Sequence, residues 1–351
     1  MQFFGQSKPP LGIIFDSDMG NRIDTALAMA LMYGLDGKNE ARVVSVSVSK
    51  SNLNSAALTE AIGRFYAGAV SGAFGAFGRN LPVGMSTEGK SPEDTTMLLG
   101  PLSKKNAEGA PLYPHGIHKL IDTAEVPALI RNALTSQQDA NAIAVLAGPA
   151  TNFARVLDLP GVKDLITRKL RLLVVSGGAF PSGEAEPHIK SDIAAARKLF
   201  AEWPGPIVAS GAEVGSALLY PAASIEKDFS WSPAHPVVDA YRAARPMPYD
   251  APTWDMTAVL HAVRLKENYF KLSEPGTIGV DDNGRTKFTP AADGKHRYLI
   301  LDPAQKDRIV SAYIELASAK PVVRVRRFRP EEQKQQKAEP PKPPEAKPQP
   351  K

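Results

Sequence analysis

The apolar residues of the chain fall into short runs and longer runs, and the two kinds predict different elements. The short runs are rich in Val, Ile and Leu and end in Gly, Ser, Asp or Asn, which is typical of strands. The longer runs continue without a breaker and predict helices. Strands are expected at residues 13–15, 41–49, 81–84, 142–146, 169–175, 206–210, 278–281, 285–289 and 297–301. Helices are expected at residues 26–33, 55–65, 126–134 and 303–318, after residue 152, after residue 192 and from residue 255.

This alternation predicts the fold class α/β, with a mostly parallel central sheet and helices on both faces. A chain of 351 residues with 43% hydrophobic composition can bury one large core or two smaller ones. We expect one α/β domain over residues 1–318. Residues 319–351 are rich in Pro, Lys, Glu and Gln and poor in apolar side chains, so we expect a disordered tail there.

The charge of the chain is unevenly distributed. Its net charge is +5, but residues 319–351 carry ten Lys and Arg against four Glu, so the remainder is close to neutral. We therefore expect no nucleic-acid binding by the folded body. The absence of cysteine excludes disulfides, thiolate nucleophiles and zinc–thiolate sites. No apolar run is long enough for a transmembrane helix. A cytoplasmic protein is expected, and a secreted or periplasmic one with a removed presequence stays open.

Three carboxylates follow the first expected strand within a few residues. They are Asp16, Asp18 and Asp24, and they lie at the carboxyl end of that strand, where open α/β sheets bind ligands. Carboxylates at such density repel one another unless a cation or a proton relieves them, and calcium prefers oxygen ligands of this kind. The simpler interpretation also stays open, in which Asp16 and Asp18 only cap a turn and a helix.

The stretch resembles the signature of the inosine–uridine type nucleoside hydrolase family. That signature is a strand, Asp-x-Asp-x-Gly and then aspartates that open a helix, and here it reads FDSDMGNRIDT. Residues 147–152 (AGPATN) resemble the second signature of the family. Residues 176–178 (SGG) resemble its Gly-Gly loop, and Asp255 stands where the family has an aspartate at the head of a helix. The resemblance covers about residues 11–317.

The resemblance implies hydrolysis of the N-glycosidic bond of a ribonucleoside, with calcium as cofactor and a small-molecule nucleoside as partner. Asp18 would be the catalytic base, which deprotonates a water that the metal activates. The implied calcium ligands are Asp18, Asp24, the backbone carbonyl of Ala147, Asp255 and the position of Thr25. The implied substrate-binding residues are Asp24, Asn52, Glu186 and His188. A turn or capping role is the other interpretation of Asn52. A homo-oligomer stays open.

Several residues depart from the family pattern at this site. Thr25 stands where the family has a second aspartate, His188 replaces an Asn, and Trp254 stands where many members have His. Arg22 adds a cation inside the motif. We expect Arg22 to pair with Asp16, Asp18 or Asp24, which would weaken calcium binding and slow hydrolysis. In the opposing interpretation Arg22 points to solvent and water replaces the missing ligand.

Two other function classes stay open for this reason. One is a nucleoside hydrolase-like protein without the metal, which serves as a binding or scaffold module. The other is a different ribosyl hydrolase, which acts on a nicotinamide riboside-like substrate. His115 and His118 lie in a long irregular excursion over residues 86–123 and are candidates for proton donation to the leaving base. Their alternative is to be solvated loop residues.

Overall fold

The structure is a computed structural model that describes residues 9–68, 81–88 and 93–322. The described residues up to Pro321 form one compact unit. From residue 323 on, the tail expected at residues 319–351 lies outside the described residues. Among the described residues, no helix combines the length and the apolar character that crossing a membrane requires.

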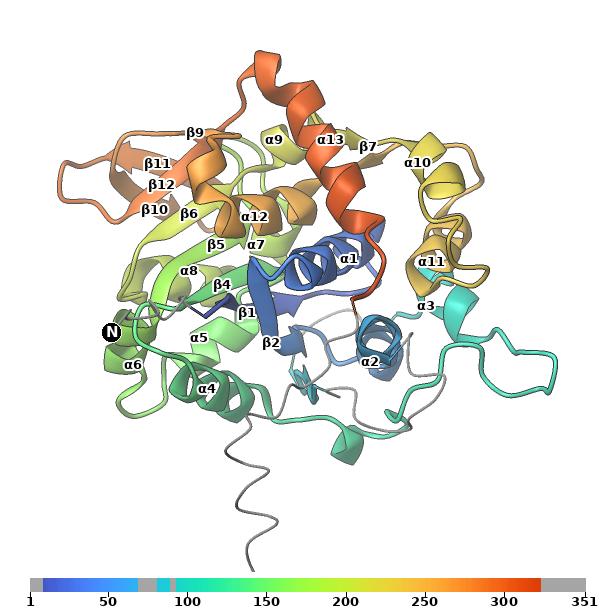
Figure 1. Ribbon diagram of the computed structural model, residues 1–351. Helices are drawn as coiled ribbons and strands as arrows, with labels where there is room; N and C mark the ends of the chain where they lie inside the picture. The colour runs from blue at the N-terminus through green and yellow to red at the C-terminus, as the bar shows by residue number, and fades with distance from the viewer. Residues whose placement is uncertain (1–8, 69–80, 89–92, 323–351) are drawn as a thin grey trace, which may run out of the picture. The chain divides into compact units, whose positions relative to one another are not determined.

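The first unit is built on one sheet whose central strands run parallel (Figure 1). β1 (Leu11–Ser17) lies between β2 (Ala41–Val48) and β4 (Ala142–Ala147) and pairs with both in parallel. The parallel order continues with β3 (Val83–Met85) beside β2, and with β5 (Leu170–Ser176), β6 (Ile207–Ser210) and β12 (His296–Ile300) beyond β4. The mostly parallel sheet predicted from the sequence is confirmed.

Antiparallel strands occupy the edge beside β12 and a separate small sheet. β10 (Gly276–Val280) and β11 (Thr286–Pro290) form the expected hairpin at that edge. The short strands pair as β9 (Lys271–Leu272) with β12, and β7 (Leu219–Tyr220) with β8 (Ala251–Pro252).

Side chains of β1 alternate between two cores, because successive residues of a strand point to opposite faces. Ile13 and Phe15 lie in one core and Ile14 in the other. The first core is covered by α1 (Ile23–Gly37), α2 (Leu53–Gly68), α11 (Pro236–Ala244), α12 (Trp254–Val263) and α13 (Lys306–Ala317). The second core is covered by α4 (Val126–Ser136), α5 (Thr151–Val156), α6 (Val162–Lys169) and α8 (Ile193–Glu202). Helices therefore cover both faces, as predicted (Figure 1).

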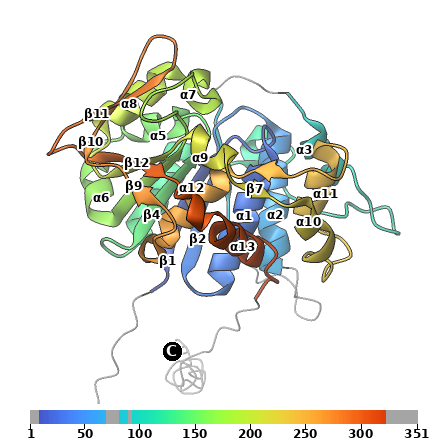
Figure 2. The same cartoon turned by 90° about the horizontal axis from the view of Figure 1, so that it is seen from above.

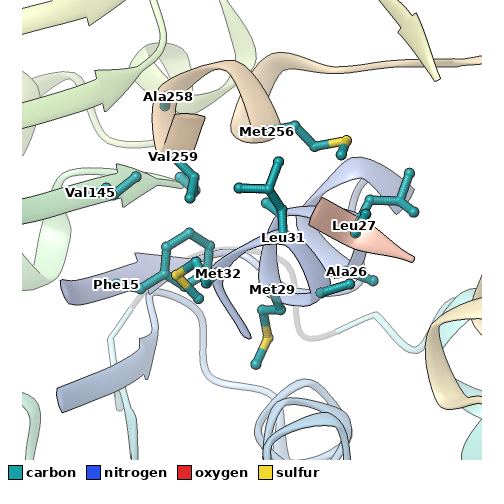
Figure 3. Close-up of a cluster of buried hydrophobic side chains, with 14 of the residues drawn as sticks. Phe15, Ala26, Leu27, Met29, Leu31, Met32, Val145, Met256, Ala258 and Val259 are labelled. Atoms are coloured by element: carbon teal, nitrogen blue, oxygen red, sulfur yellow. The ribbon is translucent and has the colours of Figure 1, made fainter. Parts of the chain in front are cut away.

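The first core joins β1 and β4 to α1 and α12. Figure 3 shows Phe15 and Val145 from the strands facing Leu31 from α1 and Val259 from α12, and all four are buried. This packing fixes the starts of α1 and α12 beside the carboxyl ends of the strands.

Helix α1 is longer than the sequence pattern suggests. A break is expected near Gly34, yet the helix continues to Gly37. A side chain at Gly34 would place its Cβ 2.0 Å from the carbonyl oxygen of Leu316 on α13. The glycine therefore permits a close crossing of α1 and α13 and does not end the helix.

Several short helices were not expected from the sequence. α3 (Thr96–Leu102) lies within the excursion at residues 86–123, although Gly and Pro within it lower its helix propensity. Figures 1 and 2 show α3, α10 and α11 together, at the end of the unit away from the hairpin. The remaining short elements are α7 (Pro187–Ser191), α9 (Ala212–Ser216), α10 (Ala222–Lys227), η1 (Leu120–Asp122), η2 (Leu265–Glu267) and η3 (Pro303–Gln305).

Candidate active site

The candidate site is built on the turn between β1 and α1. The chain leaves β1 at Ser17 and turns at Gly20, whose φ of 103° lies in the left-handed region that favours glycine. A Cβ at Gly20 would also meet the Leu98 side chain at 2.7 Å. The turn brings Asp18 next to the first helical residues of α1, where Asp24 and Thr25 are buried.

Asp18 is a buried carboxylate that keeps one oxygen without a partner. Its Oδ2 accepts a hydrogen bond from Asn21 Nδ2 at 2.6 Å and lies 3.5 Å from His188 Nε2. Its Oδ1 has no hydrogen-bond partner among the residues that the structure describes. Burial alone would raise the pKa of Asp18, but His188, Arg22 and Asn21 together lower it to about 2. The carboxylate is therefore ionised at neutral pH.

Lys50 is a buried cation beside this carboxylate, and the sequence analysis assigned it no role. Its Nζ donates to Asn21 Oδ1 at 2.8 Å and so fixes the amide that holds Asp18. It directly follows an expected parallel strand, at the same sheet edge as Asp18, and this position is the signal that could have identified it. Burial lowers the pKa of Lys50, although Asp18 opposes that effect.

His188 lies on α7 and faces Asp18 through one ring nitrogen. Its Nδ1 lies 2.7 Å from the Ser176 carbonyl oxygen and must donate there, because a carbonyl only accepts. Nε2 is thereby directed toward Asp18 and Arg22. Burial alone would lower the pKa of His188, but Glu186 and Asp18 raise it to about 10. A protonated ring donates to Asp18, whereas only a neutral ring can accept from Arg22, so one protonation state cannot make both contacts.

Glu186 caps α7 and binds Arg22. Its Oε2 accepts from the backbone N–H of His188 at 2.9 Å and of Ile189 at 3.3 Å. Its Oε1 accepts from Arg22 NH2 at 3.0 Å. The Arg22 guanidinium also lies 4.8 Å from the ring centre of Trp254, which is cation–π distance. Arg22 thus reaches the site, as expected, but its ion-pair partner is Glu186 and not Asp16, Asp18 or Asp24.

Asp24 and Asp255 form a buried pair that joins α1 to α12. The backbone N–H of Asp255 donates to Asp24 Oδ2 at 2.7 Å. The two oxygens of Asp255 accept from the hydroxyls of Ser176 at 2.7 Å and Thr25 at 2.6 Å. Burial and the neighbouring Asp255 raise the pKa of Asp24, and burial also raises the pKa of Asp255. The two hydroxyl donors favour the ionised form of Asp255, so the proton of the pair belongs on Asp24.

Three of the expected residues make contacts of a structural kind. Asp16 is buried and accepts from Ser47 Oγ and Asn152 Nδ2, and burial raises its pKa to about 7. Asn52 caps α2 by accepting from the backbone N–H of Ser55 at 2.9 Å, and it also donates to Asp94 at 3.0 Å. The Ala147 carbonyl accepts from the backbone N–H of Asp18 at 3.2 Å.

The two histidines of the excursion lie beside each other. The rings of His115 and His118 are 4.9 Å apart between centres, and His115 Nδ1 contacts the Ile117 carbonyl oxygen. The backbone N–H groups of Gly116 and Ile117 donate to Glu60 on α2. These ring contacts lie within the loop itself, and proton donation by either histidine stays a prediction.

Comparison with known proteins identifies the family. Residues 13–318 match the family described as inosine-uridine preferring nucleoside hydrolase. The chain belongs to this family. Family membership identifies this chain as a hydrolase that acts on N-glycosyl bonds. No curated protein matches the chain.

Solved structures share the fold at low sequence identity. The purine-preferring ribonucleoside hydrolase from Gardnerella vaginalis superposes with a TM-score of 0.63 and 17% identity, over 88% of this chain and 98% of that chain. The inosine-uridine preferring nucleoside hydrolase from Bacillus anthracis gives 0.62 and 16%, over 88% and 99%. The type III effector protein XopQ, complexed with adenosine diphosphate ribose, gives 0.61 and 16%, over 89% and 96%. These likenesses show the nucleoside hydrolase-like fold.

The residues expected from the sequence to bind calcium do not fit calcium in this chain. The Thr25 hydroxyl donates to Asp255, both Asp255 oxygens accept from hydroxyls, and the Ala147 carbonyl accepts from Asp18. Of the expected ligand oxygens, Asp18 Oδ1 and Asp24 Oδ1 lack a partner among the described residues, whereas calcium takes about six to eight oxygens. Within residues 9–68, 81–88 and 93–322, no three His, Asp or Glu side chains are grouped so that they could hold a metal ion.

Proposed function

We propose that this chain hydrolyses the N-glycosidic bond of a nucleoside, releasing the free base and ribose. The observation that carries the proposal is Asp18, an ionised and buried carboxylate with an unpartnered oxygen at the carboxyl edge of the sheet. An unpartnered buried oxygen is costly unless a water or a ligand contacts it. In a chain of this family, a water at that oxygen is the proposed nucleophile.

The proposed reaction breaks the bond between the ribose C1′ and the base nitrogen. The base leaves with the electron pair and takes up a proton from solvent, positive charge develops on the sugar ring, and the water adds to C1′ while Asp18 accepts its proton. Asp18 then releases that proton to solvent. A pKa of about 2 makes Asp18 a weak base. The developing oxocarbenium ion compensates, because it attracts both the water and the negative carboxylate. Asp18 is therefore assigned two roles, proton acceptor and electrostatic stabiliser.

Ribose is proposed to bind beside Asp24, Glu186 and His188. Asp24 Oδ1 has no partner among the described residues, and because Oδ2 accepts from the backbone N–H of Asp255, Oδ1 would carry the proton of the pair and donate to a sugar hydroxyl. Glu186 and His188 both contact Arg22, so a sugar that binds them must share them with the guanidinium or displace it. The amide of Asn52 is engaged by Ser55 and Asp94, and its substrate contact stays a prediction. No step of the proposed reaction passes through calcium, because the donor set does not fit it.

A second candidate function is binding of a ribosyl compound without its cleavage. The observation in its favour is the position of Arg22, which engages Glu186 Oε1 and contacts His188, the residues proposed to bind the sugar. XopQ, which has a similar fold, is described as complexed with adenosine diphosphate ribose. That compound is therefore the proposed probe for this alternative.

One panel of substrates tests the two candidates together. The protein is incubated with inosine, guanosine, adenosine, uridine, cytidine, nicotinamide riboside and adenosine diphosphate ribose, and chromatography measures free base and ribose. Hydrolysis predicts equal amounts of base and ribose from at least one nucleoside. The matched control is Asp282→Asn, because Asp282 lies on the exposed turn between β10 and β11. Intact nucleosides together with measurable binding of adenosine diphosphate ribose would favour the second candidate.

A further inference from the structure

The site contains more buried negative groups than an uncharged interior tolerates. Asp18, Asp24, Glu186 and Asp255, called here the carboxylate cluster, are at most 5% exposed. Carboxylates brought together out of water must be neutralised by protons, by a metal ion or by cations of the protein. The donor set does not fit calcium, so protons and cations of the chain together have to supply the neutralising charge.

We propose that Arg22 takes the place of a divalent cation in this site, so that the carboxylate cluster is held by a charge built into the chain and has no calcium requirement. The proposal deepens the proposed function and rests on it only for the identity of the site.

Arg22 is held in the cluster by two different contacts. Its guanidinium donates to Glu186 at 3.0 Å and lies over the ring of Trp254 at 4.8 Å. Its side chain is 17% exposed, so solvent screens its charge only partly. Because Trp254 directly precedes Asp255, the stacking contact holds the guanidinium at the start of α12, beside the Asp24–Asp255 pair.

Thr25 supports the same interpretation. A carboxylate at this position would need a cation beside Asp24 and Asp255, whereas a hydroxyl can donate a hydrogen bond. Thr25 Oγ1 donates to Asp255 Oδ2 at 2.6 Å, and Ser176 Oγ donates to Asp255 Oδ1 at 2.7 Å. The hydroxyl thus stabilises Asp255 without an ion. Arg22, Thr25 and Trp254 are three of the four positions at which this sequence departs from the expected family pattern, and the contacts of these three all serve the same group of carboxylates.

The test is a titration of calcium into protein that has been treated with chelator, followed by calorimetry. Thermal unfolding is measured in parallel with chelator or with calcium chloride. A calcium site at a hundred times its dissociation constant raises the melting temperature by several degrees. We expect no binding heat at millimolar calcium and equal melting temperatures in the two buffers. Binding with a dissociation constant below about 10⁻⁴ M, within the range of protein calcium sites, would overturn the proposal.

Variants make the test two-sided. Arg22→Met keeps the length of the side chain and removes its charge, and Arg22→Met with Thr25→Asp also adds a carboxylate. We expect the single variant to melt several degrees below the parent and the double variant to gain calcium binding, with a melting temperature that calcium raises. Arg22→Lys should stay independent of calcium. Melting of Arg22→Met at the parent temperature, or no calcium binding by the double variant, would contradict the proposal.

Arg308→Met is the matched control. Arg308 makes the same kinds of contact, an ion pair with Glu267 at 2.9 Å and a position 4.3 Å from the ring centre of Tyr269, but it is 46% exposed. Its loss should not create calcium binding. Nucleoside hydrolysis in chelator separates the two proposals. No hydrolysis under any condition would contradict the proposed function and leave the titration result standing, whereas hydrolysis that requires calcium would contradict the role of Arg22.

Discussion

The buried carboxylate of Asp239 and the carboxylate cluster differ in whether all of their oxygens have hydrogen-bond partners. Asp239 on α11 has both oxygens filled, Oδ1 by Lys104 Nζ at 2.6 Å and Oδ2 by the Tyr113 hydroxyl at 2.5 Å. In the carboxylate cluster, Asp18 and Asp24 each keep an oxygen without a partner among the described residues. Burial is common to both groups, so burial does not distinguish them. The unpartnered oxygens do, because a fold tolerates their cost where a water or a ligand is to bind.

Asp239 has a mechanical role. Lys104 and Tyr113 lie in the excursion after α3, so their contacts with Asp239 tie that segment to α11. The same segment contacts the site turn, because the Thr95 hydroxyl donates to the Gly20 carbonyl oxygen at 2.8 Å. Asp239 therefore holds in place a segment that contacts the turn carrying Asp18.

The largest expected effect is on turnover, from Asp18→Asn. Loss of the proton acceptor should lower kcat by about 10²–10⁴-fold. The urea midpoint should fall, because a pKa of about 2, below the ordinary value of Asp, shows that the neighbouring groups stabilise the ionised Asp18 in the fold. Steady-state kinetics with the best nucleoside of the panel and urea unfolding measure the two quantities. Near-normal turnover in Asp18→Asn would show that the proton acceptor is another residue and would remove the basis of the comparison.

Asp239→Asn should show the opposite pattern. The neutral amide loses the ion pair with Lys104, and its nitrogen would face either Lys104, which can only donate, or Tyr113, whose hydroxyl would have to turn and accept in place of donating to a carboxylate. We expect a loss of about 1–3 kcal/mol in the free energy of unfolding and turnover within tenfold of the parent. Lys104 is 47% exposed, so the buried Tyr113 contact carries most of this effect. A variant as stable as the parent would contradict the role of Asp239 in holding the segment of Lys104 and Tyr113 to α11.

The sequence predicts the sheet well because the signal is local. The strands β1 and β4 are fully buried apolar runs, and such runs have few alternatives. The position of Asp18 follows, because the carboxyl ends of parallel strands meet at one edge. Short helices such as α3 and α11 were missed because packing between them, and not helix propensity, stabilises them.

The partner of Arg22 could not be predicted for a related reason. Proximity in the sequence suggests Asp24, but Arg22 directly precedes α1 with extended backbone angles, φ −136° and ψ 143°. Burial would lower the pKa of Arg22, but Asp255 and Asp24 raise it, so its charge lies near them although its ion-pair partner is another residue. That partner is Glu186, which is 164 residues away along the chain and follows β5. Only the fold brings the ends of β1 and β5 near each other.

A change of pH should distinguish α11, which carries Asp239, from the carboxylate cluster. His235 caps α11 by accepting from the backbone N–H of Val237, and burial lowers its pKa to about 3. Its folded pKa lies below the unfolded value of about 6.5, so its contribution to stability is complete above pH 6.5 and is lost as the pH falls toward 3. Protonation of His235 should lower the free energy of unfolding by on the order of 2 kcal/mol between pH 7.5 and pH 5.

His235→Gln measures this contribution, because an amide can cap the helix but does not titrate. Urea unfolding at the two pH values should show a smaller loss for the variant than for the parent. Equal losses would mean that acid destabilises the protein elsewhere and that α11 is not the acid-sensitive region.

The smallest expected effect comes from Thr95→Val, which removes the hydroxyl that joins the excursion to the site turn. Valine keeps the shape of threonine, so packing is retained while the bond to the Gly20 carbonyl oxygen is lost. We expect about 0.5–1.5 kcal/mol less stability and a rise in KM with little change in kcat, because the turn would position Asp18 less firmly before substrate binds. Thr135→Val is the control, since the Thr135 hydroxyl makes the same kind of bond to a backbone carbonyl on the exposed face of α4. If KM in Thr95→Val equals that of the control, the bond between the excursion and the site turn does not affect how Asp18 is positioned.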